Sequence, residues 1–301
     1  MKYFYLIILS IIWGTYYISN KISVQTTSVF SVGLFIRIFT FFLLIIIMFF
    51  SKELKNLKVI KYNYKKLFII GFFGFLLDVF AFLGLTYSTA SNGAILLKTD
   101  VLFANVISLI LGITFGLFDW IGTLLMFGGI IFVLNIDVSN FNFNFGDIFF
   151  ILSGLFISLN AFIIKSLQNS ENPVKGKTIA FYNNFFAMIF FMIFSFVQRG
   201  GEIFSFNRES LFPLVIAGIC QTLVYLVYYF NIKIFPVWIV VVFLLFMPVF
   251  VTAVGVLFLN EKVVLIQYFG FLLILSGAIS IIYSQNKKYI KISKNCSIKK
   301  E

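Results

Sequence analysis

The chain has 301 residues, of which 61% are hydrophobic and 11% are charged, and it carries a net charge of +12. Soluble globular proteins contain about 25% charged residues, so this composition excludes an ordinary water-soluble enzyme or binding domain. The sequence has no histidine and only Cys220 and Cys296 as cysteines, which excludes imidazole catalysis and a disulfide framework; we expect no catalytic residue, metal site or cofactor.

Apolar runs of roughly 20 residues recur along the whole chain, and each is long enough to cross about 30 Å of hydrocarbon as a helix. They lack the period-two alternation of a transmembrane β-strand. The first run has no small-residue cleavage site and is interpreted as a retained helix, not a signal peptide. The predicted fold class is an all-α polytopic membrane protein with ten transmembrane helices, at 3–20, 28–50, 67–87, 90–112, 116–135, 147–165, 178–198, 211–231, 236–258 and 263–284.

Aromatic and charged residues interrupt the apolar runs of the first half. Trp13 and Tyr17 lie one turn apart in the first span, where they could form an aromatic wall of a cavity or pack against lipid. Four ionisable residues fall at similar depths in the next three spans: Arg37, Asp78, Lys98 and Asp100. Each charge costs about 2.5–3.5 kcal/mol at the centre of a membrane helix, so we expect the four to pair.

The stretch "ILLKTDVLF" (95–103) holds two of these charges. Residues two apart on a helix point about 200° from each other, so Lys98 and Asp100 do not face each other. We predict two cross-helix pairs, Asp78 with Lys98 and Arg37 with Asp100. Two interpretations stay open: the pairs only fix the register of the helices, or Lys98 and Asp100 face a central cavity.

The second half carries uncharged polar groups instead. They are candidates to line a cavity or to bond to neighbouring helices: Asn160, Asn183, Asn184, Gln221, Tyr225, Tyr229 and Trp238. Pro248 removes a backbone hydrogen bond within the ninth span, so we predict a kink there and a candidate hinge. The small residues of "MFGGIIF" (126–132) and "GFLLILSG" (270–277) allow close packing between helices, either within one chain or in a homodimer.

The positions of Lys and Arg predict the orientation in the membrane. The lysine-rich loop 51–66 and the basic tail 285–301 fall on one side, and the opposite loops hold only Lys21, Arg199, Arg208 and Lys262. Both termini are therefore expected in the cytoplasm of a multi-pass protein of the inner (plasma) membrane. The positive net charge is therefore explained by the orientation of the chain in the membrane. For this reason no nucleic-acid partner is expected.

An internal repeat relates the two halves at a displacement of about 147 residues. Gly71 then falls on Gly218, and "DVLFANVISLILG" (100–112) on "PVFVTAVGVLFLN" (248–260). Five spans per half is an odd number, so the halves enter the membrane in opposite senses, as in many secondary transporters with a site near the midplane. We predict repeats at 1–138 and 147–284, an external linker at 139–146 and a cytoplasmic tail at 285–301.

The pattern resembles the drug/metabolite transporter superfamily, in particular its ten-helix EamA-type members. The resemblance lies in "WGTYYISNK" (13–21), in Arg37, and in "MPVFVTAVGVLFLNEKVVLIQYFGFLLILSGAI" (247–279), which has Glu261 and Gln267 at family-like spacing. It implies a carrier of small metabolites or amphipathic compounds, often an amino-acid exporter, working without ATP. The chain departs from the family where a proline is usual, at Asp100, and where a glutamate is usual, near Ile113.

These observations favour a secondary active transporter of amino acids or related small metabolites, with membrane lipid as its surroundings. Lys98 would meet a substrate carboxylate, and Asp100 an amine or, because an apolar setting favours a neutral carboxyl, a coupling proton. Arg37, Asp78, Trp13, Tyr17, Gln221, Tyr225 and Trp238 would complete the site. The alternatives are an exporter of amphipathic or cationic drugs, if Asp78 neutralises Lys98, and, more remotely, a membrane-embedded lipid-phosphate enzyme.

Overall fold

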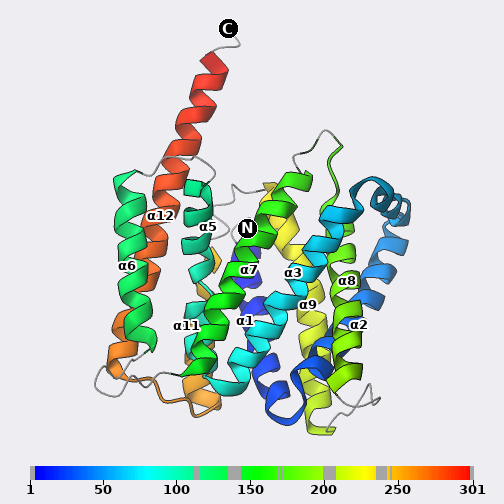
Figure 1. The fold of residues 1–301 in the computed structure, drawn as a ribbon, viewed down its shortest axis with the longest axis horizontal. Coiled ribbons are helices and arrows are strands. Elements are labelled where there is room, and N and C mark those ends of the chain that lie inside the picture. Colours follow the sequence, from blue (N-terminus) through cyan, green and yellow to red (C-terminus); the bar gives the residue numbers. More distant parts are fainter. Residues whose placement is uncertain are drawn as a thin grey trace.

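A computed structural model describes residues 4–110, 116–134, 144–168, 170, 172–198, 208–234, 243–244 and 246–298. Long helices run side by side through one bundle, and the end of the last helix projects beyond it (Figure 1). The elements are α1 (Phe4–Thr26), α2 (Val29–Phe50), the 3₁₀ helix η1 (Leu54–Val59), α3 (Ile60–Tyr87), α4 (Ala90–Leu96), α5 (Thr99–Ile110), α6 (Leu117–Leu134), α7 (Phe145–Gln168), α8 (Gly176–Gln198), α9 (Arg208–Ile234), α11 (Phe246–Phe258) and α12 (Leu265–Ile298).

The helices match the predicted spans. Within the described residues, seven helical segments are long and apolar enough to cross a membrane, and two shorter apolar helices cover 117–133 and 246–258. Large apolar side chains such as Phe50, Leu124 and Leu265 are strongly exposed on the outer surface, as expected where the surrounding medium is lipid. The protein is thus an all-helical, multi-pass membrane protein. One predicted span, 90–112, is interrupted: α4 and α5 are separate helices.

The two halves pack against each other as inverted copies. Extensive contacts join α3 to α7 and α1 to α9, and a second matched set joins α3 to α8 and α2 to α9. Under the repeat, α1, α2 and α3 correspond to α7, α8 and α9. The contact of α3 with α7 is therefore equivalent to that of α9 with α1, and the contact of α3 with α8 to that of α9 with α2. The contacts between α2 and α8 and between α6 and α12 join a helix to its own counterpart. This arrangement follows from a pseudo-two-fold axis between the halves.

Glycine contacts follow the same symmetry. Gly71 of α3 packs against Phe186 of α8, and its counterpart Gly218 of α9 packs against Phe39 of α2. Phe39 and Phe186 are themselves related by the repeat. The glycine matches that suggested the repeat in the sequence are therefore positions where a phenylalanine of the other half approaches the backbone closely. A side chain would collide with the Cβ of Phe186 at Gly71 and with the ring of Phe39 at Gly218.

The interface between α6 and α12 also contains reciprocal glycine contacts. A Cβ at Gly129 would lie 2.8 Å from the carbonyl oxygen of Gly270, and a Cβ at Gly122 would lie 2.6 Å from that of Gly277. The motifs "MFGGIIF" and "GFLLILSG" thus hold the two halves of one chain together, because their small residues allow the backbones to touch.

Two adjacent glycines of α6 give a matched test of this interface. A Cβ at Gly129 would clash with the backbone of α12, whereas a Cβ at Gly128 would meet no atom within 4 Å. We expect Gly129→Ala to lower the free energy of unfolding by about 1–3 kcal/mol, as overpacking does. Gly128→Ala should instead leave it unchanged or raise it by up to about 1 kcal/mol, because alanine favours helix. Unfolding of the purified variants in detergent checks this; equal effects would contradict it.

Candidate functional site

A buried ion pair joins α2 and α3. Arg37 Nε donates to Asp78 Oδ2 at 3.0 Å, and Nη2 donates to the same oxygen. The side chains are 2% and 5% exposed. The predicted pairs, Asp78 with Lys98 and Arg37 with Asp100, are therefore wrong. The prediction matched residues by depth along the membrane normal, but depth does not determine which faces of the helices meet.

Two polar residues of the second half complete the surroundings of the Arg37 guanidinium. Nη1 donates to Tyr225 Oη at 2.7 Å and to Asn184 Oδ1 at 3.3 Å. Asn184 Nδ2 in turn donates to the carbonyl oxygen of Arg37 at 2.8 Å. Under the repeat, Arg37 corresponds to Asn184 and Asp78 to Tyr225, so the four side chains form one cluster around the pseudo-two-fold axis. We call Arg37, Asp78, Asn184 and Tyr225 the axial cluster.

The axial cluster satisfies its own charges and joins α2, α3, α8 and α9. A buried arginine with a carboxylate and several further acceptors is compensated where it lies. This geometry favours the interpretation in which Arg37 and Asp78 fix the register of the helices. It leaves Lys98 and Asp100 to be explained separately.

Lys98 lies where the fourth span breaks. The turn between α4 and α5 is held by backbone hydrogen bonds between residues three apart. They run from Lys98 N to Ile95 O at 2.9 Å, from Asp100 N to Leu97 O at 3.1 Å and from Val101 N to Lys98 O at 3.2 Å. Asp100 Oδ1 also accepts from Val101 N at 2.8 Å. An Asp side chain competes for backbone groups in this way, which disfavours a continuous helix. The "KTD" triplet therefore interrupts the helix in which it stands.

Helix α7 of the other half supports the break. A Cβ at Gly154 would lie 3.2 Å from Asp100 N and 3.3 Å from Leu97 O. Ser158 Oγ donates to the carbonyl oxygen of Asp100. Close approach at Gly154 and a hydrogen bond at Ser158 thus bind the interrupted backbone, which a bilayer would otherwise leave without partners. The helix break is a packed feature of the interface between the halves.

The Lys98 ammonium faces an aromatic side chain of α1. Its Nζ lies 5.9 Å from the centroid of the Trp13 ring, and Trp13 meets Tyr228 of α9 edge to face at 6.0 Å. Lys98 is only 6% exposed, and in the described part of the chain no carboxylate lies within ion-pair distance of its ammonium. Asp100 acts on this cation electrostatically from beyond that distance, and the contact that the ammonium makes is the cation–π contact with Trp13. Asp100, partly exposed, lies two residues further on.

The other predicted site residues lie elsewhere. Tyr17 packs on Phe150 at 6.2 Å and lies close to Gly93 of α4, not at Lys98. Gln221 is buried in α9 without a contact to Lys98. Trp238 lies outside the described residues.

Pro248 is the third residue of α11 as the structure describes it, Phe246–Phe258. Residues 235–242 and 245, which precede it, lie outside the described residues, and Leu244, four residues before the proline, is itself helical. The kink and the hinge at Pro248 therefore stay predictions.

A second polar cluster stabilises the start of α4. Glu261, between α11 and α12, accepts hydrogen bonds from Ala90 N at 2.5 Å and from Ser91 N at 3.0 Å. Gln267 donates to Asn92 Oδ1 at 3.2 Å, and Asn92 donates to Asp147 Oδ2 at 3.1 Å. In the sequence, Glu261 and Gln267 stand out only for their family-like spacing, and no role was predicted for them. Their partners are about 170 residues away, and no local pattern indicates such contacts.

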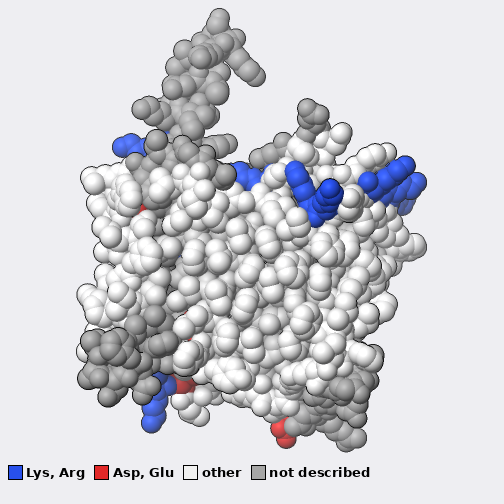
Figure 2. Space-filling model, viewed as in Figure 1, with Lys and Arg blue, Asp and Glu red and all other residues white. Residues whose placement is uncertain are grey.

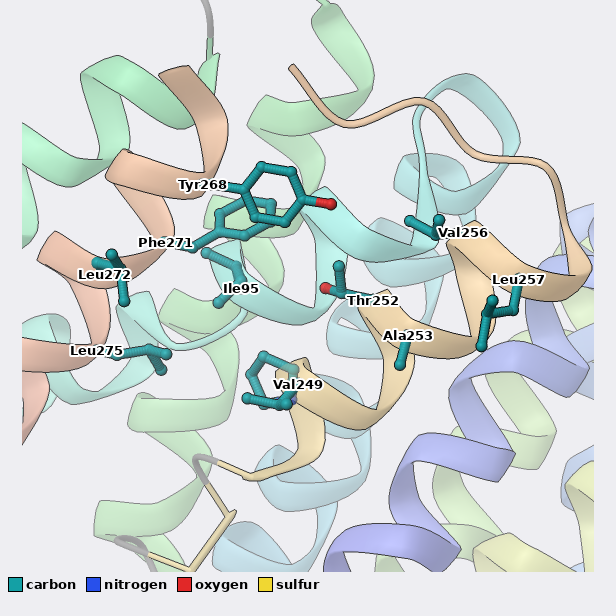
Figure 3. A pocket seen from close by; sticks show the side chains of 11 residues that line it. Ile95, Val249, Thr252, Ala253, Val256, Leu257, Tyr268, Phe271, Leu272 and Leu275 are labelled. Carbon is teal, nitrogen blue, oxygen red and sulfur yellow. The ribbon is translucent and has the colours of Figure 1, made fainter. Parts of the chain in front are cut away.

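An apolar groove of about 450 Å³ opens between α11 and α12, with Ile95 of α4 at its base. Figure 3 shows that the hydroxyls of Thr252 and Tyr268 are the polar groups among its labelled side chains. Several lining residues, including Leu257 and Leu272, are strongly exposed. Neither Lys98 nor Asp100 lines this groove, so it is distinct from the charged break.

Comparisons with known proteins agree with this architecture. An uncharacterized transporter of Archaeoglobus fulgidus is 29% identical over 283 residues, which is 91% of this chain and 83% of the relative. A second uncharacterized transporter of that organism is 26% identical over 193 residues, 62% of this chain and 65% of the relative.

One solved structure, described only as the crystal structure of a protein, has a TM-score of 0.63 at 13% identity and covers 93% of this chain and 96% of its own. It therefore supports the fold alone. The model of the EamA-like transporter family matches residues 1–135 and 144–283. With a match to each half, the chain belongs to the EamA-like transporter family.

Proposed function

We propose that this protein is a secondary active transporter of small zwitterionic metabolites, amino acids or related compounds, with its substrate site at the break between α4 and α5. The observation that carries the proposal is the buried Lys98, whose ammonium has no carboxylate within ion-pair distance among the described residues. A cation costs several kcal/mol within a membrane unless something compensates it. A substrate carboxylate would supply that compensation each time it binds.

The surroundings of Lys98 suit the remainder of such a substrate. Asp100, on the following turn, can accept an ammonium group or bind a coupling proton. The ring of Trp13 offers an apolar wall beside the charged groups. Interrupted helices in both repeats are typical positions of substrate sites in secondary transporters, because they bring polar groups to the midplane.

The alternative, an exporter of amphipathic cations, is less well supported. It required Asp78 to neutralise Lys98, and Asp78 is instead bonded to Arg37. Asp78 is therefore not available to neutralise Lys98, and an ammonium group at this position would repel a cationic ligand. We propose that both termini lie in the cytoplasm, because Figure 2 shows Lys and Arg gathered at the end of the bundle from which α12 projects.

Ligand-induced stabilisation of the purified full chain tests the proposal. We expect amino acids or related zwitterions to raise the unfolding temperature in detergent, and amphipathic amines not to do so. Flux of the best ligand into proteoliposomes, with and without a proton gradient, then tests transport, and Asp100→Asn tests coupling. Stabilisation by amines alone would contradict the proposal, and full proton-driven flux in Asp100→Asn would remove the coupling role of Asp100.

A further inference from the structure

The segment between α2 and α3 has a period of three residues. Its sequence is "SKELKNLKVIKYNYKK" (51–66), with lysines at 52, 55, 58 and 61. The structure forms a 3₁₀ helix, η1, over Leu54–Val59. Lys55 and Lys58 lie three apart within η1 and therefore stack on one face of it, because a 3₁₀ helix has 3.0 residues per turn. Lys52 precedes η1 in the turn after α2, and Lys61 follows it as the second residue of α3. We call Lys52, Lys55, Lys58 and Lys61 the lysine row; all four side chains are exposed.

A second row with the same period fixes this segment to the protein. Leu54, Leu57 and Ile60 are partly buried against an apolar cluster that includes residues of α2, α3, α7 and α8. Tyr182 Oη of α8 donates to the carbonyl oxygen of Leu57 at 2.6 Å, and Lys177 pairs with Glu53 at 3.5 Å. The segment is therefore an amphipathic platform bound to both halves of the protein, with the lysine row directed away from it.

The lysine row is not neutralised by the described part of the protein. The acid of the segment, Glu53, pairs with Lys177, and the described residues place no carboxylate within ion-pair distance of the row. Tyr62 and Tyr64, which follow the row, are 80% and 57% exposed. Exposed tyrosines next to the end of a membrane helix are typical of the level of the lipid headgroups. The platform joins the ends of two such helices and forms part of the basic edge in Figure 2.

We propose that the lysine row is a binding surface for the phosphate groups of anionic phospholipids. Lys55 and Lys58 are about 6 Å apart along the 3₁₀ helix, and Lys52 and Lys61 flank them, so the ammonium groups can each meet a phosphate of the adjoining headgroup layer. Basic residues beside a membrane helix attract anionic lipid in this way. The rule that basic loops stay inside explains why this loop is positively charged. It does not require the lysines to be exposed on one side while the leucines on the other side pack against the protein.

Competition between lipids in the full-length protein tests the proposal. The probe is spin-labelled phosphatidylglycerol, compared with phosphatidylcholine at low and high salt. We expect wild type to prefer phosphatidylglycerol at low salt and to lose the preference at high salt. The variant Lys55→Gln/Lys58→Gln/Lys61→Gln should lower the preference about 10-fold or more. Its unfolding temperature should not change, because these side chains are exposed.

A matched control removes the same charge elsewhere. Lys287→Gln/Lys288→Gln/Lys291→Gln neutralises three lysines in the C-terminal part of α12 and should lower the preference clearly less than the row variant does. Replacing the row with arginines should also keep it. The proposal is overturned if the row variant binds phosphatidylglycerol as wild type does, or if the control loses as much preference, since net charge alone would then explain binding.

Discussion

We expect Lys98→Met to abolish ligand-induced stabilisation while the unliganded protein unfolds at the same temperature as wild type or higher. Methionine has a similar length and no charge, so it removes a buried cation that has no carboxylate within ion-pair distance among the described residues. Relief of the cost of that charge, about 2.5–3.5 kcal/mol on insertion scales, offsets the cation–π contact with Trp13, worth about 0.5–2 kcal/mol. A structural lysine would show the opposite change in stability.

The loss of binding should be large. A hydrogen bond between charged groups contributes about 1.5–3 kcal/mol, so the dissociation constant of a carboxylate ligand should rise about 10- to 100-fold. Titrating the unfolding temperature with the best ligand of the screen measures this change. Transport in proteoliposomes should fall in parallel, because the site must be occupied for the carrier to cycle.

A neighbouring substitution controls for damage to the helix break. Thr99 is buried, and its hydroxyl has no hydrogen-bond partner among the described residues. Thr99→Val replaces a hydroxyl with a methyl group at the helix break and leaves Lys98 unchanged, so stability and ligand response should both be retained. If Lys98→Met unfolds early and the ligand response survives, Lys98 is a structural residue and the site lies elsewhere.

The sequence predicts the membrane class, the spans and the repeat because each depends on properties that are periodic along the chain. Hydropathy over about 20 residues locates a span, and recurring glycines such as Gly71 and Gly218 locate contacts that the pseudo-two-fold axis makes twice. The depths of the four intramembrane charges follow in the same way. These predictions need no knowledge of which helices are neighbours.

The pairing of the charges cannot be obtained by this reasoning. Arg37 meets Asp78 because α2 and α3 turn these faces toward each other and toward Asn184 and Tyr225. That choice depends on the rotation of each helix about its axis, which is set by packing across both halves. Lys98 then lies apart, beside Trp13. Residues at equal depth are candidates for pairing, and tertiary packing selects among them.

Two local features of the sequence indicate structure that the predicted spans do not contain. Thr99 and Asp100 are poor residues for the interior of a helix, and they stand where α4 ends and α5 begins. A hydropathy window averages over such a break and reports one span. The lysines and leucines of 51–66 likewise recur every three residues, which is the period of a 3₁₀ helix, and η1 forms within this segment.

Breaking the axial cluster should cause the largest loss of stability. Asp78→Asn leaves the guanidinium of Arg37 in the core without its counter-ion, and removing one partner of a buried ion pair costs about 3–5 kcal/mol. We expect the unfolding temperature to fall by about 5 °C or more. Tyr225→Phe removes one hydrogen bond of the same guanidinium and serves as the milder comparison, at about 1–3 kcal/mol.

The double variant Arg37→Met/Asp78→Asn separates an ion pair from two independent effects. With both charges removed, no uncompensated charge stays in the core, so the double variant should be more stable than Asp78→Asn alone. A double-mutant cycle on unfolding in detergent measures this coupling. Ligand-induced stabilisation should persist in every member that folds, because Lys98 is unchanged. Additive losses of stability would contradict the ion pair. Loss of the ligand response at full stability would show instead that Arg37 and Asp78 belong to the substrate site.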